Sequence, residues 1–125
     1  MQAVLRDVLS GNNHDAQIVV AQKQDIPYKK NGWQFTWRKL YRVEGALFYK
    51  IAIQATPEIV EGMLMLTLIN GEMLYLNNIE VAPHNFGSQG RYEHVAGSLL
   101  AFGCYKSFEL GRKHYLGFLS FDSKT

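Results

Sequence analysis

The sequence holds a single cysteine, Cys104, so no disulfide can form within one copy of the chain. Its four histidines are scattered, and none stands at zinc-finger spacing from that cysteine, which argues against a structural metal site. No apolar run approaches the roughly 18 residues of a membrane span, and no repeat, low-complexity tract or proline-rich linker divides the chain. These absences predict one globular domain over residues 1–125 and no membrane partner.

The charge of the chain is nearly balanced. Thirteen Lys and Arg residues oppose eleven Asp and Glu residues, for a formal charge of +2. Electrostatic nucleic-acid binders carry much more positive charge, so a nucleic-acid partner is not expected. The N-terminus carries Arg6 and Asp7 where a signal peptide has its apolar core, and we therefore expect a cytoplasmic location.

Hydrophobic spacing in the first half of the chain predicts two helices and one strand. A short N-terminal helix, ending at Gly11, is indicated by the helical spacing of Val4, Leu5, Val8 and Leu9. Residues 18–21 resemble a strand. A second helix, with buried tryptophans and exposed lysines, is expected between the turn at Asn31-Gly32 and Gly45. The mixture of lysines and aromatics over 29–39 also allows single-stranded nucleic-acid binding as a weaker alternative.

From Leu47 the hydrophobic period changes to two, which predicts a half-buried strand over 47–54. The run 62–69 is apolar on both faces and is expected to be a strand covered on both sides. Asn70-Gly71 follows it, and this dipeptide between two strand-like runs predicts a hairpin that pairs 63–69 antiparallel with 73–81.

A third helix is expected after the polar loop 83–90, and Gly111 is its expected end. Its sheet-facing side, with Cys104 as a buried thiol, is predicted to be Ala96, Leu99, Leu100, Gly103, Cys104, Ser107 and Phe108. Residues 115–121 alternate as a last strand. The element order predicts an α+β fold with a mixed, mostly antiparallel sheet flanked by helices, and its last two strands parallel. Strand 115–121 would leave an exposed edge, which predicts a homo-oligomer.

The junction between the strand ending near Pro83 and the helix after Gly90 is the segment that suggests chemistry. A strand that leads through a loop into a helix offers unpaired N–H groups and the positive end of the helix dipole at one point. Arg91 adds a cation, and small residues at 96–98 allow an anion to approach the backbone. His84 and Asn85, which begin the loop, are adequately explained by turn formation.

This junction resembles the GNAT superfamily of N-acetyltransferases, whose signature is Arg/Gln-x-x-Gly-x-Gly/Ala. The chain reads Arg91-x-x-His94-x-Ala96, with His94 at the middle glycine, and continues Gly-Ser-Leu-Leu. Val81-x-Pro83 resembles the end of the family's fourth strand. The resemblance covers roughly residues 47–121. It implies a GNAT-like (acyl-CoA N-acyltransferase) fold that is C-terminally incomplete, without the family's further helix and strands.

The resemblance also implies a function and a site. The co-substrate would be acetyl-CoA, the acceptor an unidentified amine, and the coenzyme-binding residues Val81, Arg91, Tyr92, Glu93, His94, Val95, Ala96 and Gly97. Glu80 would be the general base and Tyr92 the acid for the departing thiolate, against the alternatives of a solvated strand carboxylate and a packing aromatic. A non-catalytic relative serving as a binding or assembly module is the alternative function.

Overall fold

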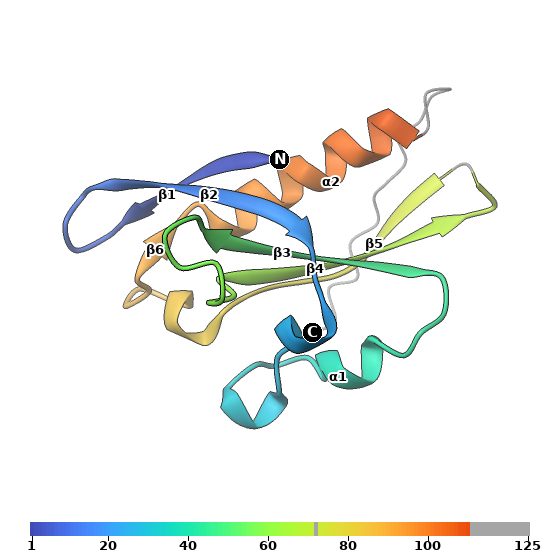
Figure 1. Cartoon of the computed structure of the whole chain (residues 1–125), viewed down its shortest axis with the longest axis horizontal. Coiled ribbons are helices and arrows are strands. Elements are labelled where there is room, and N and C mark those ends of the chain that lie inside the picture. The colour runs from blue at the N-terminus through green and yellow to red at the C-terminus, as the bar shows by residue number, and fades with distance from the viewer. Residues whose placement is uncertain (72, 111–125) are drawn as a thin grey trace.

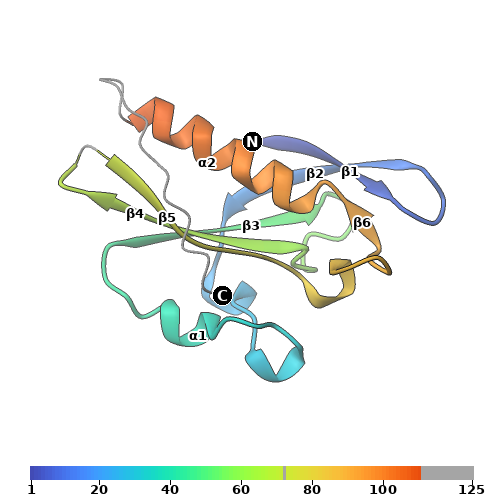
Figure 2. The ribbon, with the colours of Figure 1, turned by 180° about the vertical axis from the view of Figure 1, so that it is seen from behind.

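Six strands form one curled antiparallel sheet, with a helix on each of its faces (Figures 1 and 2). The computed structural model describes residues 1–71 and 73–110. The strands are β1 Gln2–Asp7, β2 Asn13–Val20, β3 Ala46–Ile53, β4 Gly62–Ile69, β5 Met73–Val81 and β6 Tyr92–Glu93, in the spatial order β5-β4-β3-β2-β1-β6. The helices are α1 Trp37–Leu40 and α2 Val95–Leu110, with single 3-10 turns η1 Lys23–Asp25, η2 Lys29–Asn31 and η3 Pro83–Asn85.

The α+β class and the antiparallel pairing are confirmed. The predicted strand 115–121, its parallel pairing and its exposed edge lie outside the described residues, as does the predicted helix end at Gly111. No helix within 1–71 and 73–110 combines the length and apolar character needed to cross a bilayer.

Strand β4 separates two hydrophobic cores, as its doubly apolar sequence predicts. Leu64 and Leu66 face α2 and belong to the larger core, whereas Met63 and Met65 face the segment that carries α1. All four side chains are at most 3 % exposed. Because successive strand residues point to opposite faces, one strand contributes to both cores at once.

The predicted hairpin is confirmed, with β4 and β5 paired from Gly62↔Val81 to Ile69↔Met73 and a register shift between Met65 and Leu66. Asn70 and Gly71 have φ values of 54° and 69°. Asparagine and glycine are the residues that tolerate this left-handed conformation best, which explains why this dipeptide marks the reversal.

The predicted N-terminal helix is wrong, because residues 2–7 form strand β1. β1 pairs antiparallel with both β2 and β6, and Leu5 is fully buried whereas Val4 is 47 % exposed. The spacing of Val4, Leu5, Val8 and Leu9 fits a helix, but hydrogen bonding to two neighbouring strands decides the conformation of this segment. Gly11, with φ of 76°, lies in the β1–β2 turn instead of ending a helix. β2 contains most of the predicted 18–21 strand but begins earlier, at Asn13.

The predicted helix between Asn31-Gly32 and Gly45 is reduced to the single turn α1. Trp33 and Trp37 are nevertheless buried, as expected, against the face of the sheet opposite α2. The backbone N–H groups of Gln34 and Phe35 donate to the carboxylate of Glu80, which holds this part of the segment outside the helix.

Helix α2 is confirmed, but its sheet-facing side is rotated from the predicted one. The buried residues are Val95, Leu99, Phe102, Gly103 and Ser107. Ala96, Leu100, Cys104 and Phe108 are exposed, so the prediction of a buried Cys104 is wrong. Val95 and Phe102 belong to the larger core, where α2 packs mainly against β5 and β4, and a helix that buries them turns the neighbouring stripe outward.

Candidate functional site

The end of β5, the following loop, β6 and the start of α2 enclose a cavity of about 360 Å³, here called the helix-start cavity. Predicted coenzyme-binding residues that line it are Val81, Tyr92, Glu93, His94, Val95 and Ala96. The other lining residues are Val8, Asn85, Gly87, Ser88 and Gly90. Arg91 and Gly97 are adjacent in sequence but do not line the cavity. The structure therefore gathers most of the predicted coenzyme site around one space.

The backbone at the start of α2 has an unusual conformation. His94 has φ of 76°, in the left-handed region that favours glycine, and it stands at the middle glycine of the family signature. Its carbonyl accepts the N–H of Ser98 at 3.0 Å. The N–H groups of Val95, Ala96 and Gly97 precede Ser98, the first residue whose N–H donates within the helix, and lie at the positive end of the helix dipole. The His94 side chain is 61 % exposed, so it points largely into solvent. A helix end with these N–H groups suits an anion.

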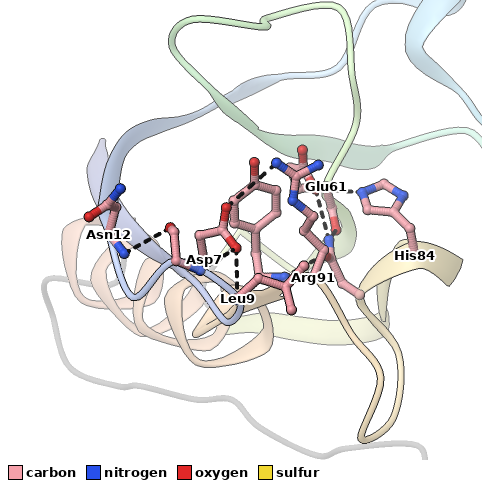
Figure 3. A network of polar contacts seen from close by, with 9 residues as sticks. Asp7, Leu9, Asn12, Glu61, His84 and Arg91 are labelled. Atoms are coloured by element: carbon pink, nitrogen blue, oxygen red, sulfur yellow. Dashed lines mark hydrogen bonds and ion pairs between the residues drawn. The ribbon is translucent and has the colours of Figure 1, made fainter.

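Arg91 is held beside this cavity by an acidic partner (Figure 3). Its Nη2 lies 3.5 Å from Oδ2 of Asp7, and its guanidinium lies 5.0 Å from the centre of the Tyr92 ring. Burial disfavours the ionised form of Asp7, but the N–H groups of Leu9 and Ser10 and the charge of Arg91 outweigh it and lower the pKa of Asp7. Arg91 is 55 % exposed, so its free donors can still reach a bound anion.

Glu80, the predicted general base, accepts three N–H groups from the α1 segment. Its carboxylate lies 2.5 Å from the N of Gln34, 3.1 Å from the N of Phe35 and 2.8 Å from Nε1 of Trp37. It is not among the residues that line the helix-start cavity, whereas its neighbour Val81 is. These contacts make Glu80 an anchor for the segment on the opposite face of the sheet.

Tyr92, the predicted acid, is half-buried and lines the helix-start cavity. Its N–H donates to Oδ1 of Asn85 at 2.9 Å, and its ring makes an edge-on contact with His14 at 5.7 Å between centres. The ring also packs against the larger core and lies under the guanidinium of Arg91.

The sequence analysis missed a polar cluster at the start of β4 (Figure 3). The carboxylate of Glu61 is 3 % exposed, and its Oε1 lies 2.7 Å from Nε2 of His84 and 2.8 Å from Nδ2 of Asn85. The same Asn85 amide donates to the Glu61 carbonyl at 3.1 Å. The only sign of this cluster in the sequence is a glutamate, Glu61, directly before the apolar run of β4. The sequence does not show that His84 and Asn85 are its partners.

His84 opens onto a second cavity, of about 470 Å³, here called the His84 cavity. Its lining residues are Gln24, Asp25, Ile26, Pro27, Tyr28, Asn31, Trp33, Glu58, Val60, Ala82, Pro83 and His84. Ala82, Pro83 and His84 thus line one cavity, while Val81 and Asn85 on either side of them line the other. Residues 81–85 therefore line both cavities.

Comparisons with family models, curated proteins and solved structures find no match to this chain.

Proposed function

We propose that this chain is an acetyl-CoA-dependent N-acetyltransferase that transfers an acetyl group to an amine. The observation that carries the proposal is the helix-start cavity, where a strand end and the unpaired amides of a helix face one space. The left-handed backbone at His94, in the position of the signature glycine, supports it independently. A side chain at this position is accommodated because it is largely exposed.

The residues around the helix-start cavity have distinct expected roles. The N–H groups of Val95, Ala96 and Gly97 would donate to the coenzyme diphosphate, and Arg91 would add a cation next to it. The end of β5 at Val81 would supply backbone groups beside the acyl carbonyl. Acetyl-CoA supplies the acyl group as a reactive thioester. Tyr92 lines the same space, and its hydroxyl would give a proton to the departing sulfur.

A second candidate function is a non-catalytic coenzyme-binding module. It is favoured by the engagement of Glu80 with three N–H donors, since a carboxylate committed to backbone and indole groups is poorly placed to receive a proton from an amine. In that case acetyl-CoA would bind and no acyl transfer would follow.

Calorimetric titration with acetyl-CoA and a thermal-shift series test the proposal. Binding to the native state adds about 2.7 kcal/mol of apparent stability at a ligand concentration of 100 Kd, so the unfolding temperature should rise with acetyl-CoA. Release of free CoA thiol in the presence of a panel of primary amines then distinguishes the enzyme from the binding module.

A pair of matched variants tests the binding site. Ala96 and Ala101 are both exposed on α2, but only Ala96 lines the helix-start cavity. Ala96→Glu places a carboxylate where the diphosphate is expected and should abolish the thermal shift, whereas Ala101→Glu should leave it unchanged. An acidic residue in the first helical turn does not weaken the helix, so lost binding would not reflect unfolding. Equal shifts for both variants would place the coenzyme elsewhere.

A further inference from the structure

The wall of the His84 cavity includes the titratable side chain of His84. The imidazole of His84 is 46 % exposed, while its partner Glu61 is 3 % exposed. A half-exposed histidine held by a buried carboxylate has the arrangement of a base and the group that orients it.

The partners of the ring decide which nitrogen is available. Nε2 faces Oε1 of Glu61 at 2.7 Å, and an ionised carboxylate only accepts hydrogen bonds. The neutral ring therefore carries its proton on Nε2, which leaves Nδ1 as the basic nitrogen. Asn85 donates to the same oxygen of Glu61 and holds the carboxylate in place. Glu61 is thus a positioning residue for His84.

The lining of the His84 cavity suits a positively charged ligand. Asp25 and Glu58 contribute carboxylates, and Tyr28 and Trp33 contribute aromatic surface, which attracts cations. Asp25 is paired with Lys50, whose Nζ lies 2.8 Å from its Oδ1, and its Oδ2 accepts the N–H of Gln22 at 2.8 Å, so the exposed Glu58 is the carboxylate available to a ligand. No Lys or Arg is among the described residues that line the cavity.

Two cationic side chains lie near the cavity: Arg38 and Lys30 lie over the Tyr28 ring, at 4.4 Å and 5.5 Å from its centre. They do not line the space. The ionisable group in contact with the imidazole is Glu61, before the start of β4; Asp25, paired with Lys50, and Glu58 are the acidic residues that line the same cavity.

We infer that the His84 cavity binds a primary ammonium compound and that Nδ1 of His84 accepts its proton, which prepares the amine for acyl transfer. The inference rests on the proposed function for its second half, since the acyl donor is expected in the helix-start cavity. Residues 81–85 separate the two cavities, so an amine beside His84 would approach the end of β5 from the face opposite the coenzyme.

The reaction balances without any further reactant. The ammonium gives one proton to Nδ1 of His84, which later releases it to water. The neutral amine attacks the carbonyl carbon of the thioester, a carbon–nitrogen bond forms, and the carbon–sulfur bond breaks with its electron pair on sulfur. The second amine proton ends on that sulfur. The products are the amide and CoA thiol.

The binding half is tested with 1,4-diaminobutane and the neutral 1,4-butanediol on protein labelled with ¹⁵N-histidine. The His84 signals are identified by their loss in His84→Gln. The diamine should move them and the diol should not, and Glu58→Gln should weaken diamine binding about fivefold. Glu44→Gln, an exposed control outside the cavity, should bind like the original chain. Unmoved His84 signals, or equal responses to diol and diamine, would overturn the site.

The catalytic half is tested by acetyl transfer to the same diamine. His84→Gln should lower kcat roughly 100-fold or more and remove the acid limb of the pH profile, with acetyl-CoA affinity unchanged. Glu44→Gln, an exposed substitution outside both cavities, is the control and should retain the original rate. Glu61→Gln should lower kcat and change the ring-nitrogen shifts that report the Nε2–H tautomer, as expected of a positioning residue.

The outcomes separate this inference from the proposed function. If acetyl-CoA binds but the diamine leaves His84 unaffected, the inference fails and the proposed function stands. If the diamine moves His84 but acetyl-CoA does not bind, the proposed function fails and the ammonium site remains. Transfer at the original rate in His84→Gln, or no transfer although both ligands bind, would overturn the role of His84 as proton acceptor.

Discussion

Replacing Glu80 by alanine removes the acceptor of three N–H groups in one step. The donors are the backbone N–H groups of Gln34 and Phe35 and the indole N–H of Trp37. The Gln34 N–H is exposed and can bond to water, whereas the other two are partly buried. Hydrogen bonds to a charged acceptor contribute about 1.5–3 kcal/mol each, so the two partly buried donors predict a loss of about 3 kcal/mol in the free energy of unfolding.

Urea unfolding followed by tryptophan fluorescence measures this loss, because Trp33 and Trp37 are buried in the core that Glu80 closes. With a urea dependence of about 2 kcal/mol per molar, the midpoint of Glu80→Ala should fall by about 1.5 M. Glu80→Gln keeps the shape but turns an NH₂ donor toward N–H donors, so it should lose a large part of the same stability. Glu44→Ala, at an exposed position, is the control.

A Glu80→Ala midpoint within about 0.5 M of the original would refute the anchoring role. The stability measurement also decides how activity data on this residue are interpreted. Trp33 lines the His84 cavity, so a loosened segment would disturb acceptor binding even if Glu80 moves no proton. Reduced activity in Glu80→Gln identifies a base only if the variant is as stable as the original chain.

Three further predictions follow from single contacts. Gly62→Ala places a Cβ 2.7 Å from Cγ1 of Val95. The resulting overpacking between β4 and α2 should lower the free energy of unfolding by about 1–3 kcal/mol, as measured by chemical denaturation. An unchanged midpoint would mean that the helix can shift freely. Folding lowers the pKa of Asp7 beside Arg91, so the stabilising effect of its carboxylate is present at neutral pH and is lost as the pH falls below about 4. Asp7→Asn should therefore flatten the acid side of the curve of stability against pH. Parallel curves for the variant and the original chain would contradict this. The exposed Cys104 should react with a thiol reagent in the native protein at a rate similar to that in urea, and strong protection would show that it is covered.

The two cavities share one short segment of chain. Residues 81–85 lead from β5 into η3; Val81 and Asn85 line the helix-start cavity, and the three residues between them line the His84 cavity. Asn85 connects the two through Glu61 on one side and the N–H of Tyr92 on the other. A change at Asn85 should therefore affect both sites, whereas changes at Ala96 or His84 should affect one each.

Patterns that depend on near neighbours in the chain predicted the corresponding parts of the fold. The doubly apolar β4 and the Asn70-Gly71 reversal each follow from the local backbone and from which faces must be buried. The helical spacing after Gly90 predicted α2 for the same reason. The period of two also predicted strand β3, but the expectation that it is half-buried is wrong, because Tyr49 packs in one core and Phe48 in the other. The location of the helix-start cavity also followed from local order, because a strand, a loop and a helix start are consecutive in the chain.

The exposed and buried sides of α2 could not be predicted from spacing alone. Two neighbouring stripes of the helix are apolar, and only contact with β4 and β5 turns Val95 and Phe102 inward and Cys104 outward. The N-terminal segment became a strand because β2 and β6 offered backbone partners on both sides. Local propensity is a weak determinant where partners distant in sequence supply the hydrogen bonds.

The sequence by itself determined the α+β class, the β4–β5 hairpin, the long helix and six of the residues that line the helix-start cavity, because these depend on residues close together along the chain. Only the tertiary structure decided that Glu80 holds the N–H groups of Gln34 and Phe35, and that Glu61 orients His84. Those contacts join positions 23 or more residues apart, and such distances are closed by the packing of the sheet and its two cores, which no local pattern records.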